Sequence, residues 1–597
     1  MKKLLAVLLT LAMVVTLFAA CGDKKPAATA SEINVCIASE PDTIDPALNS
    51  AVDGATLIAH LFSGLAKWAQ DDKGALVIVP DAAEELTEGV KNDDGTVTYT
   101  YKLRDGLTWS DGQPLTAQDF VFSWNRSCSL ELGADYGYML EIVDGYADTQ
   151  DESKPDAKLN VKAIDEKTLE VTLTTDVPYW NELLAFPSYF PVREDVVANE
   201  SWATDPATYV CNGAYKMAAW AHNSVITLEK NENYYDADKV TMDKINFYLS
   251  DDANNMLANF KNGDWKLIDD VPNNEIATLK AEYPDEFKVV GQIGTYYVCW
   301  NINEEILPAG ADVEDPESAK EEIRNAIMLL FDRNYIVDEI AQGGQVPASS
   351  FVAMGLTDAD GKTEFYKNAG TSGAFDGYYD VAANAQEANY NAAIEVLKKY
   401  YDYDEATKKF TNFPSLTYLY NTSEGHKAIG EYLQSALDGV GISIKLENQE
   451  WNTFLNTRKE GNFSIARNGW LADYNDPISF LDMWTSVSGN NDVQYGKGAN
   501  KDLKHYSLDL TPFGYETKVE NGTWAETYDV LISTIKTCTD TDKRYEMMHL
   551  AEDMLMATGC LCPLYYYTDL FMISKDVKGF FSNPLGYKYF MYTTVEA

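Results

Sequence analysis

The sequence predicts a chain of mixed α/β class that folds into more than one domain. Its 597 residues, 46% of them hydrophobic, are enough to bury a large core. Residues 97–103 alternate apolar and polar side chains, the pattern of a half-buried strand, and residues 323–330 place apolar side chains at helical spacing. Because strand and helix patterns are interspersed along the chain, we expect the α/β class.

Local signals justify the individual elements in chain order. Residues 116–124 are predicted as a helix because Thr116 stands at the N-cap and Asp119 at the capping-box position, with apolar residues following. Residues 442–446 alternate as a strand. Three charged or glycine-rich stretches are predicted as surface insertions, namely 308–318, 358–377 and 488–504.

The amino terminus has the pattern of a secretory signal peptide. Two lysines precede an apolar run over residues 4–18, which is too short for a membrane span and ends in small residues before Cys21. Residues 17–21 resemble a bacterial lipobox. We therefore expect residues 1–20 to be removed and residues 21–31 to form a lipidated Cys21 with a flexible tether. Ordinary secretion with a leftover cysteine is the alternative.

The composition is strongly acidic, with 93 Asp and Glu against 47 Lys and Arg and a formal charge of −46. Such a surface repels nucleic acid, so no nucleic-acid partner is expected. No stretch after the signal peptide is long and apolar enough to span a bilayer. The predicted location is the outer face of the cytoplasmic membrane of a bacterium, reached by export and held by the lipid anchor.

Catalytic and metal-binding motifs are missing from the sequence. The seven cysteines after Cys21 are scattered and odd in number, so they do not indicate a disulfide framework, and at least one thiol should be free. Cys560 and Cys562 fit alternation on a strand better than a metal pair. The histidines form no zinc helix, and no nucleophile elbow or phosphate loop occurs. We predict neither an enzyme nor a cofactor or metal, although paired carboxylates of the glycosidase type stay open.

A series of sequence segments, taken in chain order, carries the strongest functional signal. The segments cover almost the whole mature chain: 38–46, 61–65, 103–112, 114–124, 161–165, 211–216, 419–423, 448–451 and 469–477. In this order they resemble the oligopeptide-binding proteins of ABC importers, which are solute-binding proteins of family 5, the peptide/nickel-binding type.

The resemblance implies a two-lobed, periplasmic-binding-protein-like (type II) fold with a hinge and an extra domain. The family boundaries assign residues 32–62, 193–294 and 570–597 to lobe I, residues 63–192 to the extra domain, and residues 295–569 to lobe II. A ligand enclosed between the lobes drives closure only if it binds the closed state better.

The function that the resemblance implies is capture of short peptides and their delivery to the transmembrane subunits of an ABC permease. The protein is expected to work as a monomer on its lipid anchor. One alternative is the same fold binding nickel, haem or a sugar. A more distant alternative is a secreted hydrolase, for which the sequence shows no nucleophile, base or metal set.

The resemblance also implies the residues that contact a peptide. Asp473 matches the aspartate that pairs with the ligand ammonium, and Gly469 and Leu471 match a strand whose main chain pairs with an extended peptide. Arg467 and His426 match positions that meet the peptide carboxylate. The structural alternatives are, in the same order, an exposed carboxylate, a core strand, a surface charge pair and a residue at a helix start. Further expected contacts are the aromatic residues Trp451, Trp470, Tyr136 and Tyr297, which could equally be core residues, together with Asn421 and Val52.

Overall fold

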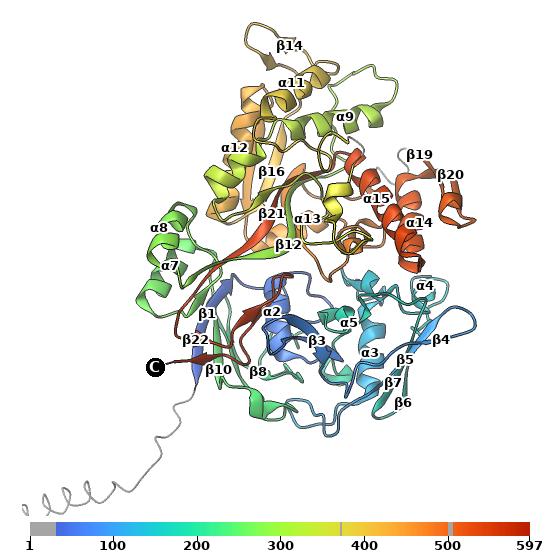
Figure 1. Ribbon diagram of the computed structural model, residues 1–597, viewed down its shortest axis with the longest axis vertical. Coiled ribbons are helices and arrows are strands. Elements are labelled where there is room, and N and C mark those ends of the chain that lie inside the picture. Colours follow the sequence, from blue (N-terminus) through green and yellow to red (C-terminus); the bar gives the residue numbers. More distant parts are fainter. Residues whose placement is uncertain (1–30, 371–372, 499–504, 597) are drawn as a thin grey trace, which may run out of the picture.

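The structure is a computed structural model that describes residues 31–370, 373–498 and 505–596. Two lobes lie one above the other in Figure 1, joined by two long strands that run between them. The upper lobe holds the strands around β16 and the helices α9 and α11 to α15. The lower lobe holds β1, β8, β10 and α2, with a smaller sheet beside them.

A mixed sheet of eleven strands, counted over the described residues, passes through both lobes. Its centre is the long antiparallel pair β12 (Phe287–Trp300) and β21 (Leu561–Ile573). The register of this pair is irregular between Gly291 and Thr295, so the ladder is interrupted there. The sheet order is β17 (Ile444–Gln449), β16 (Leu416–Asn421), β18 (Ile465–Leu471), β12, β21, β11 (Leu267–Ile268), β1 (Glu32–Ala38), β10 (Lys244–Leu249), β9 (Val225–Lys230) and β8 (Tyr215–Ala221), with β13 (Val346–Pro347) pairing β21.

Helices cover the sheet in both lobes. In α9 the predicted apolar face is confirmed, because Ile323, Ala326 and Ile327 are buried. The predicted strand at 442–446 begins two residues later, at Ile444. No helix of the described segments is long and apolar enough to cross a membrane. The main helices are α2 (Val52–Leu61), α7 (Ala253–Asn262), α8 (Ile276–Glu282), α9 (Pro316–Leu329), α11 (Gln386–Leu397), α12 (Glu424–Gly439), α13 (Trp451–Lys459), α14 (Trp524–Thr537) and α15 (Thr541–Ala557).

The smaller sheet contains β4 (Val90–Lys91), β5 (Val97–Lys102), β7 (Thr168–Leu173) and β6 (Val161–Asp165), in that order. The predicted strand is confirmed, with Val97, Tyr99 and Tyr101 buried on one face. The predicted helix is α3 (Ala117–Ser127), where the Asp119 carboxylate accepts the Thr116 backbone N–H at 2.7 Å. Two-stranded pairs complete the described strands: β2 (Ala66–Gln70) with β3 (Leu76–Pro80), β14 (Tyr403–Asp404) with β15 (Lys409–Phe410), β19 (His505–Asp509) with β20 (Lys518–Thr523), β22 (Val577–Lys578) with β25 (Thr594–Val595), and β23 (Phe581–Ser582) with β24 (Lys588–Tyr589).

The segment predicted as a surface insertion at 488–504 is partly internal, so that prediction is wrong for its first half. Asn490, Asn491 and Asp492 are buried. Asp492 accepts the Asn468 amide at 2.9 Å and lies 2.7 Å from the Arg458 Nε atom, so its charge is paired. Polar residues enter the core here because they form a hydrogen-bonded network.

The cysteines behave as buried apolar residues. All seven that the structure describes are free and buried, which confirms the prediction of at least one free thiol. Cys562 lies on β21 opposite Val298, so the strand interpretation is confirmed for Cys562, while Cys560 lies one residue before the strand begins. Burial raises the pKa of the Cys562 thiol to about 11, which keeps it protonated and inert at neutral pH.

Candidate ligand-binding site

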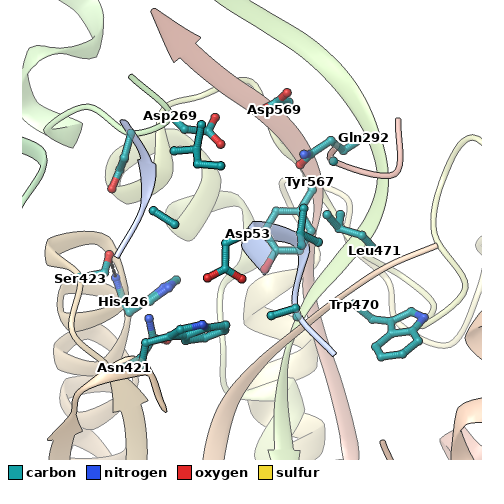
Figure 2. A pocket seen from close by; sticks show the side chains of 18 of the residues that line it. Asp53, Asp269, Gln292, Asn421, Ser423, His426, Trp470, Leu471, Tyr567 and Asp569 are labelled. Atoms are coloured by element: carbon teal, nitrogen blue, oxygen red, sulfur yellow. Dashed lines mark hydrogen bonds between the residues drawn. The ribbon is translucent and has the colours of Figure 1, made fainter. Parts of the chain in front are cut away.

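A cavity of about 520 Å³ lies between the two lobes. This volume is in the range of sites that hold small ligands. Figure 2 shows side chains from α2, β16, α12, β18 and β21 pointing into it, so segments far apart in the sequence form one site. Ten of the eleven residues predicted to contact a peptide line the cavity, namely Asp473, Arg467, His426, Gly469, Leu471, Trp470, Trp451, Tyr136, Asn421 and Val52.

Asp473 is a carboxyl group with one unpaired oxygen at one end of the cavity. It follows β18, and its Oδ1 atom accepts a hydrogen bond of 3.0 Å from the Tyr136 hydroxyl. Its Oδ2 atom is buried and has no protein partner among the described residues. A buried carboxylate oxygen without a donor is costly, so this atom needs a cationic or hydrogen-bonding ligand.

Burial raises the pKa of the Asp473 carboxyl well above its usual range, and the nearby Asp482 carboxylate raises it further. The Tyr136 hydroxyl opposes the rise. Asp482 itself is paired through its Oδ2 atom, which lies 3.1 Å from the Lys536 ammonium and accepts the Tyr474 hydroxyl, while its Oδ1 atom has no partner among the described residues. Asp473 lines the cavity and Asp482 does not, so Asp473 is the member of this pair that can meet a ligand.

Arg467 and His426 provide the opposite charge and a neutral donor. The Arg467 guanidinium lies over the Tyr296 ring, 5.3 Å from its centroid, and its Nε atom is buried without a partner. His426 lies in the first turn of α12, where its Nδ1 atom is 3.3 Å from the Tyr296 hydroxyl. Burial and the adjacent Arg467 charge hold the pKa of His426 well below its usual range. An anion placed here would meet one positive charge and one imidazole.

One edge of β18 is open toward the cavity. β12 pairs with β18 along its whole length, but β16 pairs with it only at Ile465 and Ala466. From Arg467 to Leu471 no strand in the described part of the chain continues on that side. An unpaired strand edge offers backbone donors and acceptors to an extended ligand.

Gly469 allows a close approach in the middle of this open edge. A Cβ atom at this position would lie 2.2 Å from the Tyr567 hydroxyl, so a side chain does not fit without a shift. Gly586 likewise allows Val52 and Leu471 to approach it closely, since a Cβ atom on Gly586 would lie 2.9 Å and 2.8 Å from their methyl groups. These contacts bring together β18, β21, α2 and the C-terminal segment at the cavity wall.

Aromatic and amide side chains form the rest of the expected wall. Trp470 is buried, with its indole N–H donating to the Ser479 carbonyl at 2.8 Å, and it packs near the Tyr136 ring. Trp451 begins α13 and stacks near Phe454. The Asn421 Oδ1 atom is buried without a partner at the end of β16, and Figure 2 shows its side chain beside His426.

Tyr297 does not line the cavity, so that part of the prediction is wrong. Its side chain points to the opposite face of β12, where the ring packs against Phe351 and Trp484 in the core. Adjacent strand residues face opposite sides of a sheet, and here the neighbouring Tyr296 contacts the cavity residues His426 and Arg467. Cys21, predicted as the lipidation site, lies outside the described residues.

Several charged residues of the cavity wall were not predicted from the sequence. Lys588 lies 2.8 Å from Asp269 and 3.1 Å from Asp569, which forms a buried ionic group at one end. Asp53 projects into the cavity from the first turn of α2 (Figure 2). The sequence carries no signal that distinguishes these carboxylates from the many others in so acidic a chain.

Direct contacts join the two sides of the cavity. The Lys459 ammonium of α13 lies 2.5 Å from Asp135, and the Asn475 backbone N–H donates to the Glu182 carboxylate at 2.7 Å. Together with the Tyr136 contact to Asp473, these bonds link the upper lobe to the region of the smaller sheet. The two sides therefore enclose the cavity, and the fold and site define a binding protein that holds a solute between two lobes.

The family model described as "Bacterial extracellular solute-binding proteins, family 5 Middle" matches residues 77–492. The chain belongs to this family, and the family predicted from the sequence is confirmed. The chain is 31% identical over 557 residues to the periplasmic oligopeptide-binding protein OppA of Salmonella typhimurium. The alignment covers 91% of this chain and 88% of that relative. The relatives are binding proteins of transporters, so the protein is not an enzyme.

Solved structures agree with the two-lobed fold. The Escherichia coli murein tripeptide-binding protein MppA matches with a TM-score of 0.78 and 26% identity, covering 95% of this chain and 99% of that chain. Haemophilus influenzae OppA, solved in complex with RPPGFSPFR, matches with a TM-score of 0.78 and 27% identity over the same shares. The two-lobed α/β fold of periplasmic binding proteins, predicted from the sequence, is confirmed.

Proposed function

We propose that the protein binds short peptides in the cavity and that the ligand lies along β18 with its ammonium group at Asp473. The unpaired Oδ2 atom of Asp473 is the observation that carries this proposal. A free peptide supplies an ammonium group to that atom and a carboxylate to the region of Arg467 and His426. Its backbone can pair with the open edge of β18 between them.

The dimensions of the edge suit a short ligand. Arg467 and Leu471 are four residues apart on β18. Strand geometry makes that separation about 13 Å, which is the length of about four extended residues. Relatives support the same ligand class, since Haemophilus influenzae OppA was solved with a peptide.

Native mass spectrometry of the purified protein tests this proposal, because an enclosed ligand can survive purification. We expect added masses that fragment into short peptides, and calorimetry with a peptide pool should show saturable binding without turnover. A bound metal, haem or sugar, with no heat from any peptide, would contradict the peptide assignment. Hydrolysis of the pool would contradict a binding protein that releases its ligand unchanged.

We also propose that closure involves rotation of residues 295–569 against the lobe formed by residues 32–62, 193–294 and 570–597, which carries the extra domain 63–192. The irregular register between Gly291 and Thr295 supports a hinge at this point of β12. Small-angle scattering should show a smaller radius of gyration with peptide than without it. An unchanged radius would contradict a closure of this kind.

The last part of the proposal concerns location and partners. We propose that Cys21 is lipidated and holds the protein as a monomer on the outer face of the membrane, where it delivers peptides to an ABC permease. The lipobox-like segment 17–21 supports the anchor. Replacing Cys21 with Ala should release the protein into the medium with peptide binding retained. Salt-resistant membrane association of this variant would contradict the anchor.

A further inference from the structure

Asp53 is a second cavity carboxylate that the protein leaves unsatisfied. It is the second residue of α2, and Figure 2 shows its carboxylate projecting into the cavity away from the helix. Its Oδ2 atom is buried and has no hydrogen-bond partner among the described residues. The first turn of a helix favours a negative charge, so this position stabilises an ionised carboxylate. The Oδ2 atom itself stays without a hydrogen bond.

None of the described residues that act on the Asp53 carboxyl is a compensating cation. The indole of Trp451 and backbone N–H groups of the first turn donate to the carboxylate, but the charged neighbour that acts on it is Asp42, another acid. Burial, with Asp42, raises the pKa of Asp53 to about 6, so the group remains ionised at neutral pH. A carboxylate held in this way attracts a positive group of the ligand more strongly than an exposed one.

Apart from Asp473, Arg467, Asp270 and the exposed Asp251, the other charges of the cavity wall are matched within the described part of the protein. Lys588 is shared between Asp269 and Asp569, Arg458 pairs with Asp492, and Lys459 pairs with Asp135. Under the proposed function, the two ends of a peptide satisfy Asp473 and Arg467. One more unpaired negative charge then remains at Asp53, and the backbone of a peptide has no further cation to offer.

Asp270 and the exposed Asp251 are further acids of the wall with no cationic partner among the described residues, and Asp270 differs from Asp53 in one respect. Its Oδ1 atom accepts the Val271 backbone N–H at 2.8 Å, and neither of its oxygens is a buried atom without a partner. Asp270 thus has no unmet hydrogen-bonding demand, which makes it a matched control for Asp53.

We propose that Asp53 binds the positively charged side chain of a lysine or arginine in the ligand, so that the protein selects basic peptides. This inference rests on the proposed function. A lysine ammonium supplies the hydrogen bond that Oδ2 lacks and neutralises the remaining charge. An arginine can do the same with two parallel N–H groups.

Calorimetry with four sets of tetrapeptides tests the inference. The parent peptide is Ala-Ala-Ala-Ala, and each position in turn carries Lys, norleucine or Glu, where norleucine keeps the length of lysine without its charge. At one position we expect Lys to bind roughly ten- to a hundredfold tighter than norleucine, the gain typical of a hydrogen bond to a charged group. Glu at that position should bind more weakly than norleucine.

The Asp53→Asn variant should reduce this Lys-to-norleucine ratio to near one. Using the ratio within each protein cancels any general loss of affinity from the substitution, and thermal unfolding checks the fold. Asp270→Asn should keep the wild-type ratio. If the wild type binds the peptides but never favours Lys, or if Asp53→Asn keeps the ratio, the inference is wrong while the proposed function stands. If the wild type binds none of the peptides, both fail.

Discussion

The two ends of the cavity are built in different ways. At the Asp473 end, the carboxylate is bonded to Tyr136, which lies 337 residues earlier in the chain, beside the smaller sheet. At the Arg467 end, the guanidinium lies over Tyr296 and 3.5 Å from the Tyr567 hydroxyl, both on strands of the same large sheet. The ammonium end is thus completed only where the two sides of the cavity meet, whereas the carboxylate end is formed within one lobe.

The difference suggests a sequence of events during binding. Under the proposed function, the Arg467 end is available before closure and can hold a peptide loosely, while the Asp473 end gains its full geometry as Tyr136 reaches Asp473. A ligand that satisfies Asp473 stabilises the closed state in preference to the open state, which is the condition for a ligand to drive closure.

The largest effect is expected for Asp473→Asn. Removing one partner of a buried charge pair leaves the other charge uncompensated and costs about 3–5 kcal/mol of binding free energy. Calorimetry with a short peptide measures this loss. The matched control is Asp251→Asn, an exposed carboxylate at the cavity wall, which should change the affinity little. Equal losses in both variants would show that general electrostatics, and not a specific contact, sets the affinity.

A smaller loss is expected for Arg467→Gln, about 2–3 kcal/mol, the lower part of the range for truncating a buried charged partner. The loss is smaller because His426 can still donate a hydrogen bond to the carboxylate. Amidating the peptide C-terminus makes the complementary change, so the amide should lose affinity for the wild type more than for Arg467→Gln. The same loss with both proteins would place the peptide carboxylate elsewhere.

Tyr136→Phe tests the claim that closure completes the ammonium end. Deleting the hydroxyl removes one hydrogen bond to Asp473 and should cost about 1–2 kcal/mol. Tyr138→Phe is the control, since Tyr138 is a buried neighbour that stacks on Tyr136 but does not line the cavity. If stopped-flow fluorescence shows the Tyr136 variant to be slower in initial association and unchanged in dissociation, the contact forms before closure, contrary to this account.

The smallest expected effect is a proton release on binding. Burial raises the pKa of Asp473 in the free protein, and a bound ammonium lowers it by favouring the ionised form. Affinity should therefore rise with pH below the raised pKa, by at most about tenfold per pH unit. Calorimetry in buffers of different ionisation enthalpy measures the released protons. The Asp473→Asn variant should release fewer, and an unchanged number would assign the proton to another group.

Much of this arrangement was predictable from residues in recognisable segments. Asp473, Gly469 and Leu471 belong to one matched stretch, and the structure places all three at the cavity. The strand predicted at 97–103 follows from alternation, and the helix predicted at 116–124 follows from a capping signal. Both signals depend only on residues that are close in the sequence, so they can be read without knowledge of the tertiary structure.

The errors come from properties that depend on the tertiary structure. Tyr297 was expected in the site, but the pleat of β12 turns it to the opposite face from Tyr296. The polar segment around Asp492 resembles a surface loop, although a network with Arg458 allows it to be buried. The role of Asp53 could not be predicted from the sequence, because its Oδ2 atom lacks a hydrogen-bond partner only as a result of its burial in the folded protein.

The central claim is that Asp473 pairs with the ligand ammonium, and a double-mutant cycle tests it most directly. Calorimetry compares a short peptide and its N-acetylated form with the wild-type protein and with Asp473→Asn. Because directly interacting groups fail to add in such a cycle, acetylation should cost the wild type far more than the variant. Equal losses on acetylation in both proteins would show that Asp473 is not the ammonium partner and would contradict the proposed binding mode.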